Sequence, residues 1–343
     1  MPPRRSRHPP YALTYGEFSQ FGKLGSKTSG RSALSRRAQK SKYLGTMGAL
    51  RRFFSQLAVA LLWSLHFLPP SILAVLGRGL GQALYYVARR RKNIATTNLA
   101  WCFPELPIDQ RKALCRDSFR VLGQSMLDRS LLWWGKKEAL LKLIKVVGDE
   151  KIRALIEAQQ PFILLTPHFY GLDAAAVALA CRFSAVSIYA PQKNPVFDRL
   201  FYRGRKRFGD TLLLTRQESV RTTIKAMKEG RLFYYLPDLN HHRRDSIFVP
   251  FFGVPTATIT GLSRLARAAG AVVLTCVTRT NTDGHGYVVE IGDPWSDFPT
   301  HDARADTIRM NAWLEETIRT MPEQYYWVHR RFKTRPDGEA CPY

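Results

Sequence analysis

The chain has 343 residues, of which 45% are hydrophobic and 23% charged, and this apolar content excludes a wholly disordered protein. It carries 52 Lys and Arg against 27 Asp and Glu, a net charge of +25, so we expect an acidic partner: nucleic acid, an anionic membrane, a phosphorylated substrate or an acidic protein. The five cysteines are scattered and show no C-x-x-C spacing, which argues against a disulfide framework and against a metal site.

Residues 1–46 form a basic extension that we predict to be disordered. They hold ten Lys or Arg against the single acid Glu17, with Ser, Gly and Pro between them and no apolar period. Two interpretations stay open. The extension is a nucleic-acid-binding tail, or the native chain starts at Met47, where Met-Gly-Ala-Leu-Arg-Arg precedes an apolar run as in many membrane-targeted chains.

Residues 47–92 are predicted to be a helical segment that associates with membranes. No charge occurs from residue 53 to residue 77, but Pro69-Pro70 interrupts this apolar stretch, and a basic run follows at residues 89–92. The pattern fits a bent span, a re-entrant pair of half-helices or amphipathic helices lying in the interface, and a buried core helix is the alternative. Basic residues on both sides favour contact with anionic lipids.

Residues 93–339 are predicted to form one α/β domain in which helices and short apolar strands alternate. Such alternation predicts a central, mostly parallel sheet, and the unbroken apolar runs indicate that helices cover both of its faces. We expect strands at residues 162–166, 186–190, 211–215, 232–236, 271–278 and 287–291, and helices at 109–134, 174–182, 196–208, 218–229, 259–269 and 303–320.

His168 and Asp173 are the candidates for chemistry. His168 follows the strand at 162–166, and functional groups gather at the carboxyl ends of strands in open α/β sheets. If the chain turns at Gly171, the Asp173 carboxylate can fix the His168 tautomer, so that the other ring nitrogen takes a proton from a substrate hydroxyl. The alternative is a His168 satisfied by the backbone and an Asp173 that caps the next helix.

Six segments in order resemble the lipid A biosynthesis acyltransferases, the late or secondary acyltransferases of the lysophospholipid acyltransferase superfamily. The resemblance covers about residues 47–339. Its segments are RRRKNIATTNLAWCFPE (89–105), FILLTPHFYGLD (162–173), YRGRKRFG (202–209), LLLTRQESVRTTIKAMKEGRLFYYLPD (212–238), SIFVPFFGVPTATITGLSRLARAAGAVV (246–273) and PEQYYWVHRRFKTRPDGE (322–339).

The resemblance implies roles for individual residues. His168 and Asp173 match the family's H-x4-D/E dyad, with His168 as the general base. Arg203, Arg205 and Arg216 fall where basic residues of the family are thought to hold substrate phosphate or the acyl donor, and Asp238 matches the Pro-Asp of the third motif. Relatives commonly continue with Gln-Asp where this chain has Leu239-Asn240.

Two further segments receive expectations from the same resemblance. The apolar stretch at residues 249–258 is expected to form a wall of the acyl-chain groove, and the alternative is an ordinary core loop. The basic and aromatic stretch at 327–336 is expected to cover the sheet and to face lipid phosphate or the carrier protein.

The resemblance implies an O-acyltransferase that moves a fatty acyl chain from acyl carrier protein to a hydroxyl of a phosphorylated lipid A precursor. It would work without a cofactor at the anionic inner membrane, with its active site facing the cytoplasm. The alternatives are the same chemistry with acyl-CoA or with another glycolipid or lysolipid acceptor, and, more distantly, a basic membrane-anchored nucleic-acid-binding protein. Nucleic acid is not an expected partner of the acyltransferase.

Overall fold

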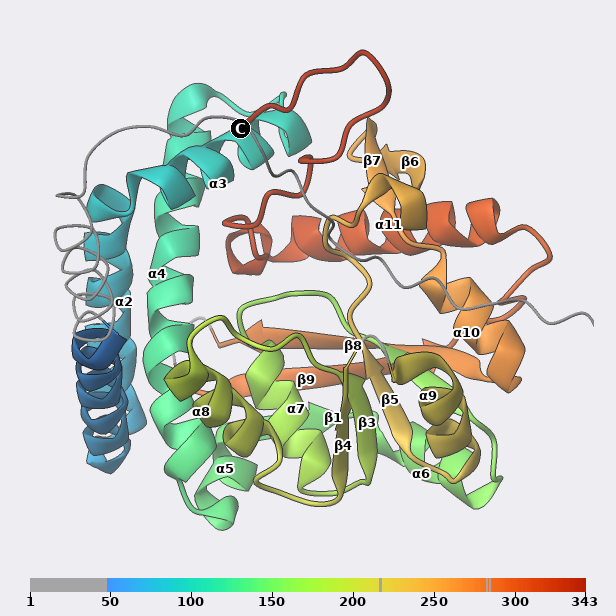
Figure 1. Cartoon of the computed structure of the whole chain (residues 1–343), viewed down its shortest axis with the longest axis horizontal. Coiled ribbons are helices and arrows are strands. Elements are labelled where there is room, and N and C mark those ends of the chain that lie inside the picture. Colours follow the sequence, from blue (N-terminus) through green and yellow to red (C-terminus); the bar gives the residue numbers. More distant parts are fainter. Residues whose placement is uncertain (1–47, 216–217, 282, 284) are drawn as a thin grey trace, which may run out of the picture. The chain divides into compact units, whose positions relative to one another are not determined.

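The computed structural model describes residues 48–215, 218–281, 283 and 285–343 (Figure 1). The chain divides into two compact units, Met1–Phe53 and Phe54–Tyr343. Residues 48–53 of the first unit are helical, and the extension predicted at residues 1–46 lies outside the described residues. The division into segments 1–46, 47–92 and 93–339 stays a prediction.

The second unit begins with helices. Residues 54–64 are helical and are followed by the short helix η1 (Leu65–Phe67), α2 (Pro70–Val87), α3 (Arg89–Cys102) and α4 (Ile108–Trp134). The first turn of a helix tolerates proline, because backbone N–H groups at this position have no intrahelical acceptor. Helix α2 accordingly starts at Pro70. Across the described part of the chain, no helix combines the length and the apolarity that crossing a membrane requires.

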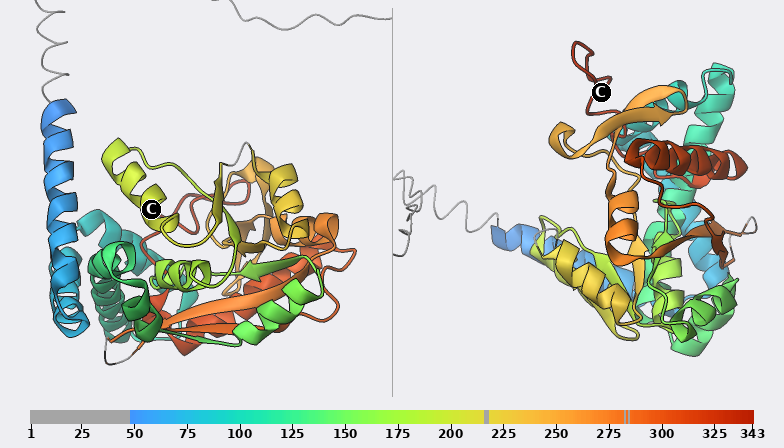
Figure 2. Two further views of the ribbon diagram at one scale, coloured as in Figure 1. Left: turned by 90° about the horizontal axis from the view of Figure 1, so that it is seen from below. Right: turned by 90° about the vertical axis from the view of Figure 1, so that its right-hand side faces the viewer.

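Glycines bring α2 and α4 into backbone contact. A methyl group built on Gly81 would lie 2.0 Å from the carbonyl oxygen of Phe119, and one built on Gly123 would lie 2.3 Å from the carbonyl oxygen of Gly77. Only the absence of side chains at these positions permits the two helices to lie so close, side by side in the views of Figures 1 and 2.

A seven-stranded sheet lies at the centre of the unit in the order β1-β9-β8-β2-β5-β3-β4. The strands β8, β2, β5, β3 and β4 run parallel to one another, whereas β9 runs antiparallel to β8 and β1 runs parallel to β9. The strands are β1 (Ile144–Val147), β2 (Phe162–Leu165), β3 (Ala185–Ile188), β4 (Thr211–Leu214), β5 (Leu232–Tyr235), β8 (Val272–Thr280) and β9 (Tyr287–Pro294).

Helices cover both faces of this sheet. Alternate strand residues point to opposite faces, so Phe162 and Leu164 pack with α4 and with α7 (Leu172–Ala180), whereas Ile163 and Leu165 pack toward the other helices. The second face is covered by α9 (Ser219–Lys228), α10 (Gly261–Ala269) and α11 (Ala303–Thr320). The remaining helices are α5 (Lys137–Leu143), α6 (Asp149–Glu157), α8 (Pro195–Arg205), η2 (Arg243–Asp245) and η3 (Pro322–Gln324).

A hairpin of β6 (Ile247–Phe251) and β7 (Val254–Thr258) projects from the main sheet beside α11 (Figure 2). Besides the two apolar clusters on the faces of the sheet, a third cluster joins this hairpin to α3, α4 and the C-terminal segment after η3. Phe251, Trp327 and Phe332 are fully buried in this third cluster. This cluster ties the C-terminal segment to the helical part of the unit.

The predicted α/β class is confirmed, and each expected strand or helix is found with ends shifted by a few residues. The structure adds β1, the hairpin and the antiparallel direction of β9, none of which the sequence predicted.

Candidate active site

A cavity of about 750 Å³ lies between one face of the sheet and the helices α4, α7 and α8. His168 and Asp173 line it at the carboxyl edge of the sheet, and apolar side chains such as Leu179, Leu213 and Leu232 also line it. Pockets of this size and apolar character are typical of small-molecule sites. Among the described residues, no group of three His, Cys, Asp or Glu side chains is placed to hold a metal ion.

His168 is paired with Asp238. The Nδ1 atom of His168 lies 2.7 Å from Oδ1 of Asp238, and the backbone N–H of His168 donates to Oδ2 at 3.0 Å. The two residues follow neighbouring parallel strands, and Leu165 pairs with Tyr235 in the register of β2 and β5. Each acts three residues beyond its strand, so the common register brings both side chains to the same point of the sheet edge.

The Asp238 carboxylate is ionised at neutral pH. Burial alone would raise its pKa, but the His168 charge and the hydrogen bonds from its ring and backbone lower the pKa to about 2. An ionised carboxylate can only accept, so Nδ1 of His168 is the donor in this pair, and in the neutral ring the lone pair is on Nε2. In the described part of the chain Nε2 has no hydrogen-bond partner, and the His168 side chain is 20% exposed toward the cavity.

Two tyrosines of the C-terminal segment form hydrogen bonds with this pair. The Tyr325 hydroxyl donates to Oδ2 of Asp238 at 3.1 Å, and the backbone N–H of Tyr326 donates to the carbonyl oxygen of His168 at 3.0 Å. The Tyr326 ring stacks with His168 and with His329. Burial, assisted by the nearby charges of His168 and Arg331, lowers the pKa of His329 to about 4, so this imidazole is neutral at pH 7.

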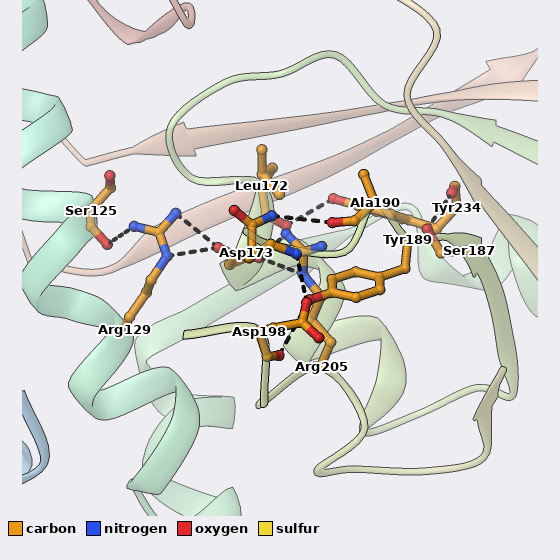
Figure 3. A network of polar contacts seen from close by, with 11 residues as sticks. Ser125, Arg129, Leu172, Asp173, Ser187, Tyr189, Ala190, Asp198, Arg205 and Tyr234 are labelled. Carbon is orange, nitrogen blue, oxygen red and sulfur yellow. Dashed lines mark hydrogen bonds and ion pairs between the residues drawn. The ribbon is translucent and has the colours of Figure 1, made fainter. Parts of the chain in front are cut away.

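Asp173 contacts two arginines instead of His168. Arg129 from α4 and Arg205 from α8 approach its carboxylate from two sides (Figure 3). The predicted His168–Asp173 pair is therefore wrong for this structure. The reason is local: α7 begins at Leu172, and the turn at Gly171 directs Asp173 toward α4 and α8, while the neighbouring strand supplies Asp238 to His168.

The other predicted binding residues have different positions. Arg205 lines the cavity, whereas Arg203 is exposed on α8 and is not among the described residues that line it. Asp238 is 2% exposed and stands behind His168 rather than in the cavity wall, which does not fit its predicted contact with substrate. Arg216 lies outside the described residues.

Neither of the two segments with predicted roles lines this cavity. Residues 249–258 belong to the β6–β7 hairpin and do not line the cavity. The next residue along the chain, Ile259, does line it. The basic stretch at 327–336 does not present all its charges outward, because Arg331 is 2% exposed. Its guanidinium donates to the carbonyl oxygen of Ala257 and to Oγ1 of Thr258, each at 2.9 Å, so it braces the hairpin.

Sequence reasoning missed Arg129, Tyr325 and Tyr326. Arg129 and Asp128 are neighbouring charged residues in the largely apolar helix end SMLDRSLLWW. Charged residues in such an apolar run could have indicated a buried polar site. The two tyrosines belong to the segment PEQYYWVHRR, whose aromatic side chains gave no indication of their partner.

Several known proteins resemble this chain over most of its length. The family model described as bacterial lipid A biosynthesis acyltransferase matches residues 42–334. The lipid A biosynthesis lauroyltransferase of Escherichia coli is 33% identical, over 85% of this chain and 95% of that protein. A lipid A biosynthesis acyltransferase of Haemophilus influenzae is 34% identical, over 83% and 91%. The lipid A biosynthesis myristoyltransferase of Escherichia coli is 31% identical, over 84% and 89%.

Among solved structures, the 1-acyl-sn-glycerophosphate acyltransferase PlsC from Thermotoga maritima matches with 13% identity and a TM-score of 0.34, covering 68% of this chain and 98% of that chain. This likeness is too distant to carry an argument. The family match and the curated relatives extend over most of the chain and include the segment around His168. The chain belongs to the bacterial lipid A biosynthesis acyltransferase family.

Proposed function

We propose that this enzyme transfers a fatty acyl chain from the thioester of acyl carrier protein to a hydroxyl of a phosphorylated lipid A precursor, with His168 as the general base. The observation that carries the proposal is the His168–Asp238 pair. Within the described residues, Nε2 of His168 has no hydrogen-bond partner, and His168 lines the cavity. Membership of the lipid A acyltransferase family supports the reaction class.

The mechanism follows from the protonation states of this pair. Asp238 keeps the proton of His168 on Nδ1, so Nε2 takes the proton from the acceptor hydroxyl. The oxygen attacks the thioester carbonyl carbon, the C–S bond breaks, and the departing sulfur takes the proton from the imidazolium. The products are an ester and a thiol. The apolar side chains that line the cavity, such as Leu179 and Leu232, suit the hydrocarbon tail of the acyl group.

The donor is proposed to be acyl carrier protein because the chain is strongly basic, with a net charge of +25, and a small acidic carrier complements it. The same chemistry with acyl-CoA, or with another glycolipid or lysolipid acceptor, is the second candidate. Assays that pair each donor with each acceptor distinguish them, and we expect kcat/KM to be highest with the acyl carrier protein thioester.

The test of the base is His168→Ala, assayed by mass spectrometry of the acylated product. General base removal is expected to lower kcat by at least about 10³-fold. His301→Ala removes an exposed histidine and serves as the matched control, with activity within twofold of the wild type. Transfer at more than a tenth of the wild-type rate in His168→Ala would contradict the proposal.

The enzyme is also proposed to act at the cytoplasmic face of the inner membrane, where it meets its lipid acceptor. Large apolar side chains are exposed on residues 54–64, η1 and α2, including Leu57 (55%), Leu61 (62%), Phe67 (69%) and Val75 (71%). Such a surface suits the boundary between lipid head groups and acyl chains. Flotation with anionic vesicles should fall for Leu57→Glu/Leu61→Glu and stay unchanged for His168→Ala, and equal flotation of both would count against docking by this surface.

A further inference from the structure

Tyr326 is a residue of the cavity wall to which the mechanism above gives no role. Its side chain is half-buried and lines the cavity. In the described part of the chain, the Tyr326 hydroxyl group has no hydrogen-bond partner, whereas the hydroxyl groups of Tyr170 and Tyr234, which also line the cavity, are both hydrogen-bonded within the protein. The Tyr326 O–H is therefore available to an acceptor oxygen on a ligand.

The Tyr326 segment is paired with the segment that carries His168. The backbone N–H of Tyr326 donates to the carbonyl oxygen of His168 at 3.0 Å, and Phe169 forms an antiparallel bridge with Tyr325. The Tyr326 ring stacks with the rings of His168 and His329, with 6.4 Å between the ring centres in each pair and angles of 29° and 22° between the planes. Backbone pairing and ring stacking together fix Tyr326 beside the proposed base.

Helix α3 holds the residues that follow Tyr326. The buried side chain of Asn98 donates from Nδ2 to the carbonyl oxygens of Trp327 and His329, at 2.6 and 2.7 Å. Arg91 donates to the carbonyl oxygen of the residue between them at 3.0 Å. A donor on a segment held in this way is preorganised, because it needs no reorientation when a charge develops beside it.

The loop after His168 has few backbone donors to offer a substrate. The N–H groups of Phe169, Tyr170 and Leu172 already donate to backbone carbonyl oxygens of this protein. In the proposed reaction, Nε2 of His168 accepts the proton of the acceptor hydroxyl and is not a donor for the thioester oxygen while that oxygen becomes negative. The reaction therefore needs a donor from another part of the cavity wall.

We propose that the Tyr326 hydroxyl group donates a hydrogen bond to the thioester oxygen of the acyl donor when the acceptor hydroxyl adds, which makes Tyr326 a second catalytic residue. The inference rests on the acyl transfer proposed above. As the new C–O bond forms, the hydroxyl proton passes to Nε2 of His168, and the C=O electron pair moves onto the thioester oxygen. The pair returns when the C–S bond breaks, and the departing sulfur takes the proton from His168. Tyr326 keeps its proton throughout.

The first experiment is Tyr326→Phe, which keeps the stacked ring and removes only the O–H. Loss of one oxyanion donor costs about 10²–10³-fold in kcat. We expect a fall of about 10²-fold in kcat with KM within threefold, because the oxygen is charged only in the transition state. Tyr202→Phe, which removes an exposed hydroxyl on α8 outside the cavity, is the matched control and should stay within twofold. A kcat of Tyr326→Phe within threefold of the wild type would refute the proposal.

A measurement on His168 separates a direct contact from an indirect effect. In the full-length enzyme labelled with ¹⁵N-histidine, we expect the Nδ1–H signal of His168, identified with His168→Gln, to persist in Tyr326→Phe because the ring stack and Asp238 remain. Loss of this signal in Tyr326→Phe would mean that the hydroxyl acts through His168, which would overturn the assigned contact.

The closing experiment measures binding without turnover. A long-chain alkyl trifluoromethyl ketone forms a tetrahedral hydrate that resembles the transition state, whereas an alkyl thioether of the same length lacks this oxygen. By calorimetry, Tyr326→Phe should weaken ketone binding at least tenfold and thioether binding less than twofold. An equal change for both probes would overturn the oxygen contact. Because no acceptor and no turnover are needed, this comparison still tests Tyr326 if His168→Ala retains transfer and the proposed base fails.

Discussion

The substitution Asp238→Asn tests the partner of the base. Asp238 accepts three hydrogen bonds: from Nδ1–H and the backbone N–H of His168, and from the hydroxyl of Tyr325. Asparagine has nearly the same shape, but it carries no charge and only one acceptor oxygen. The side chain therefore stays in place while the electrostatic partner of His168 is removed.

The size of the effect follows from the bond that is lost. A charge-assisted hydrogen bond contributes roughly 1.5–3 kcal/mol, and about 3 kcal/mol corresponds to roughly 150-fold in rate. If the amide nitrogen faces His168, the ring proton moves to Nε2 and the base is lost, which costs about 10⁴-fold in Ser-His-Asp triads. We expect kcat to fall between about 10²- and 10⁴-fold. KM should change little because Asp238 does not line the cavity.

The assay is steady-state acyl transfer with product detected by mass spectrometry. Asp293→Asn is the matched control because this carboxylate is exposed, pairs with Lys151 at 2.8 Å and does not line the cavity. It should stay within about threefold of the wild type. The reasoning is refuted if Asp238→Asn keeps more than a third of the wild-type kcat while folding normally.

Three further predictions concern stability, measured by chemical and thermal unfolding in the same detergent. Gly81→Ala should cost about 1–3 kcal/mol because its methyl group would meet the backbone of α4, whereas Gly79→Ala has open space and should be neutral or stabilising by up to about 1 kcal/mol. Burial raises the pKa of Asp128 to about 6, so the unfolded chain releases this proton at lower pH and stability falls as pH rises from about 4 to 6. Asp128→Asn should therefore add about 2–3 kcal/mol at pH 8 and nothing at pH 4, and an equal effect at both values would contradict this. Arg331→Lys should cost about 1–3 kcal/mol because lysine cannot reach both acceptors that the fork binds, and an unchanged midpoint would argue against the bracing role.

The strands and helices of the α/β domain were predictable because each is a local pattern. The run FILL at β2 and the run LFYY at β5 are apolar throughout, as strands covered on both faces must be. The hairpin was missed because residues 247–258 contain two prolines and lack a period of two, and the direction of β9 depends on its pairing with β8 rather than on its own residues.

The partner of His168 was not predictable from spacing. His168 and Asp173 are five residues apart, which invites a pairing, whereas His168 and Asp238 are brought together only because β2 and β5 are neighbours in register. Strand order is a property of the whole sheet, and no local pattern in the sequence specifies it. The contact of Arg129 with Asp173 was hidden for the same reason, since α4 and α7 meet only in the folded chain.

The backbone contact between α2 and α4 has a consequence for how the protein can vary. At Gly77, Gly81 and Gly123 the backbones of the two helices meet without a side chain between them, which fixes the distance between α2 and α4. The opposite side of α2 bears exposed apolar residues such as Val75, while α4 contributes Arg129 to the cavity. With the membrane contact proposed above, exchanges among the outward residues of α2 would adapt the enzyme to a different lipid composition without moving Arg129. Selection could then change these two properties separately.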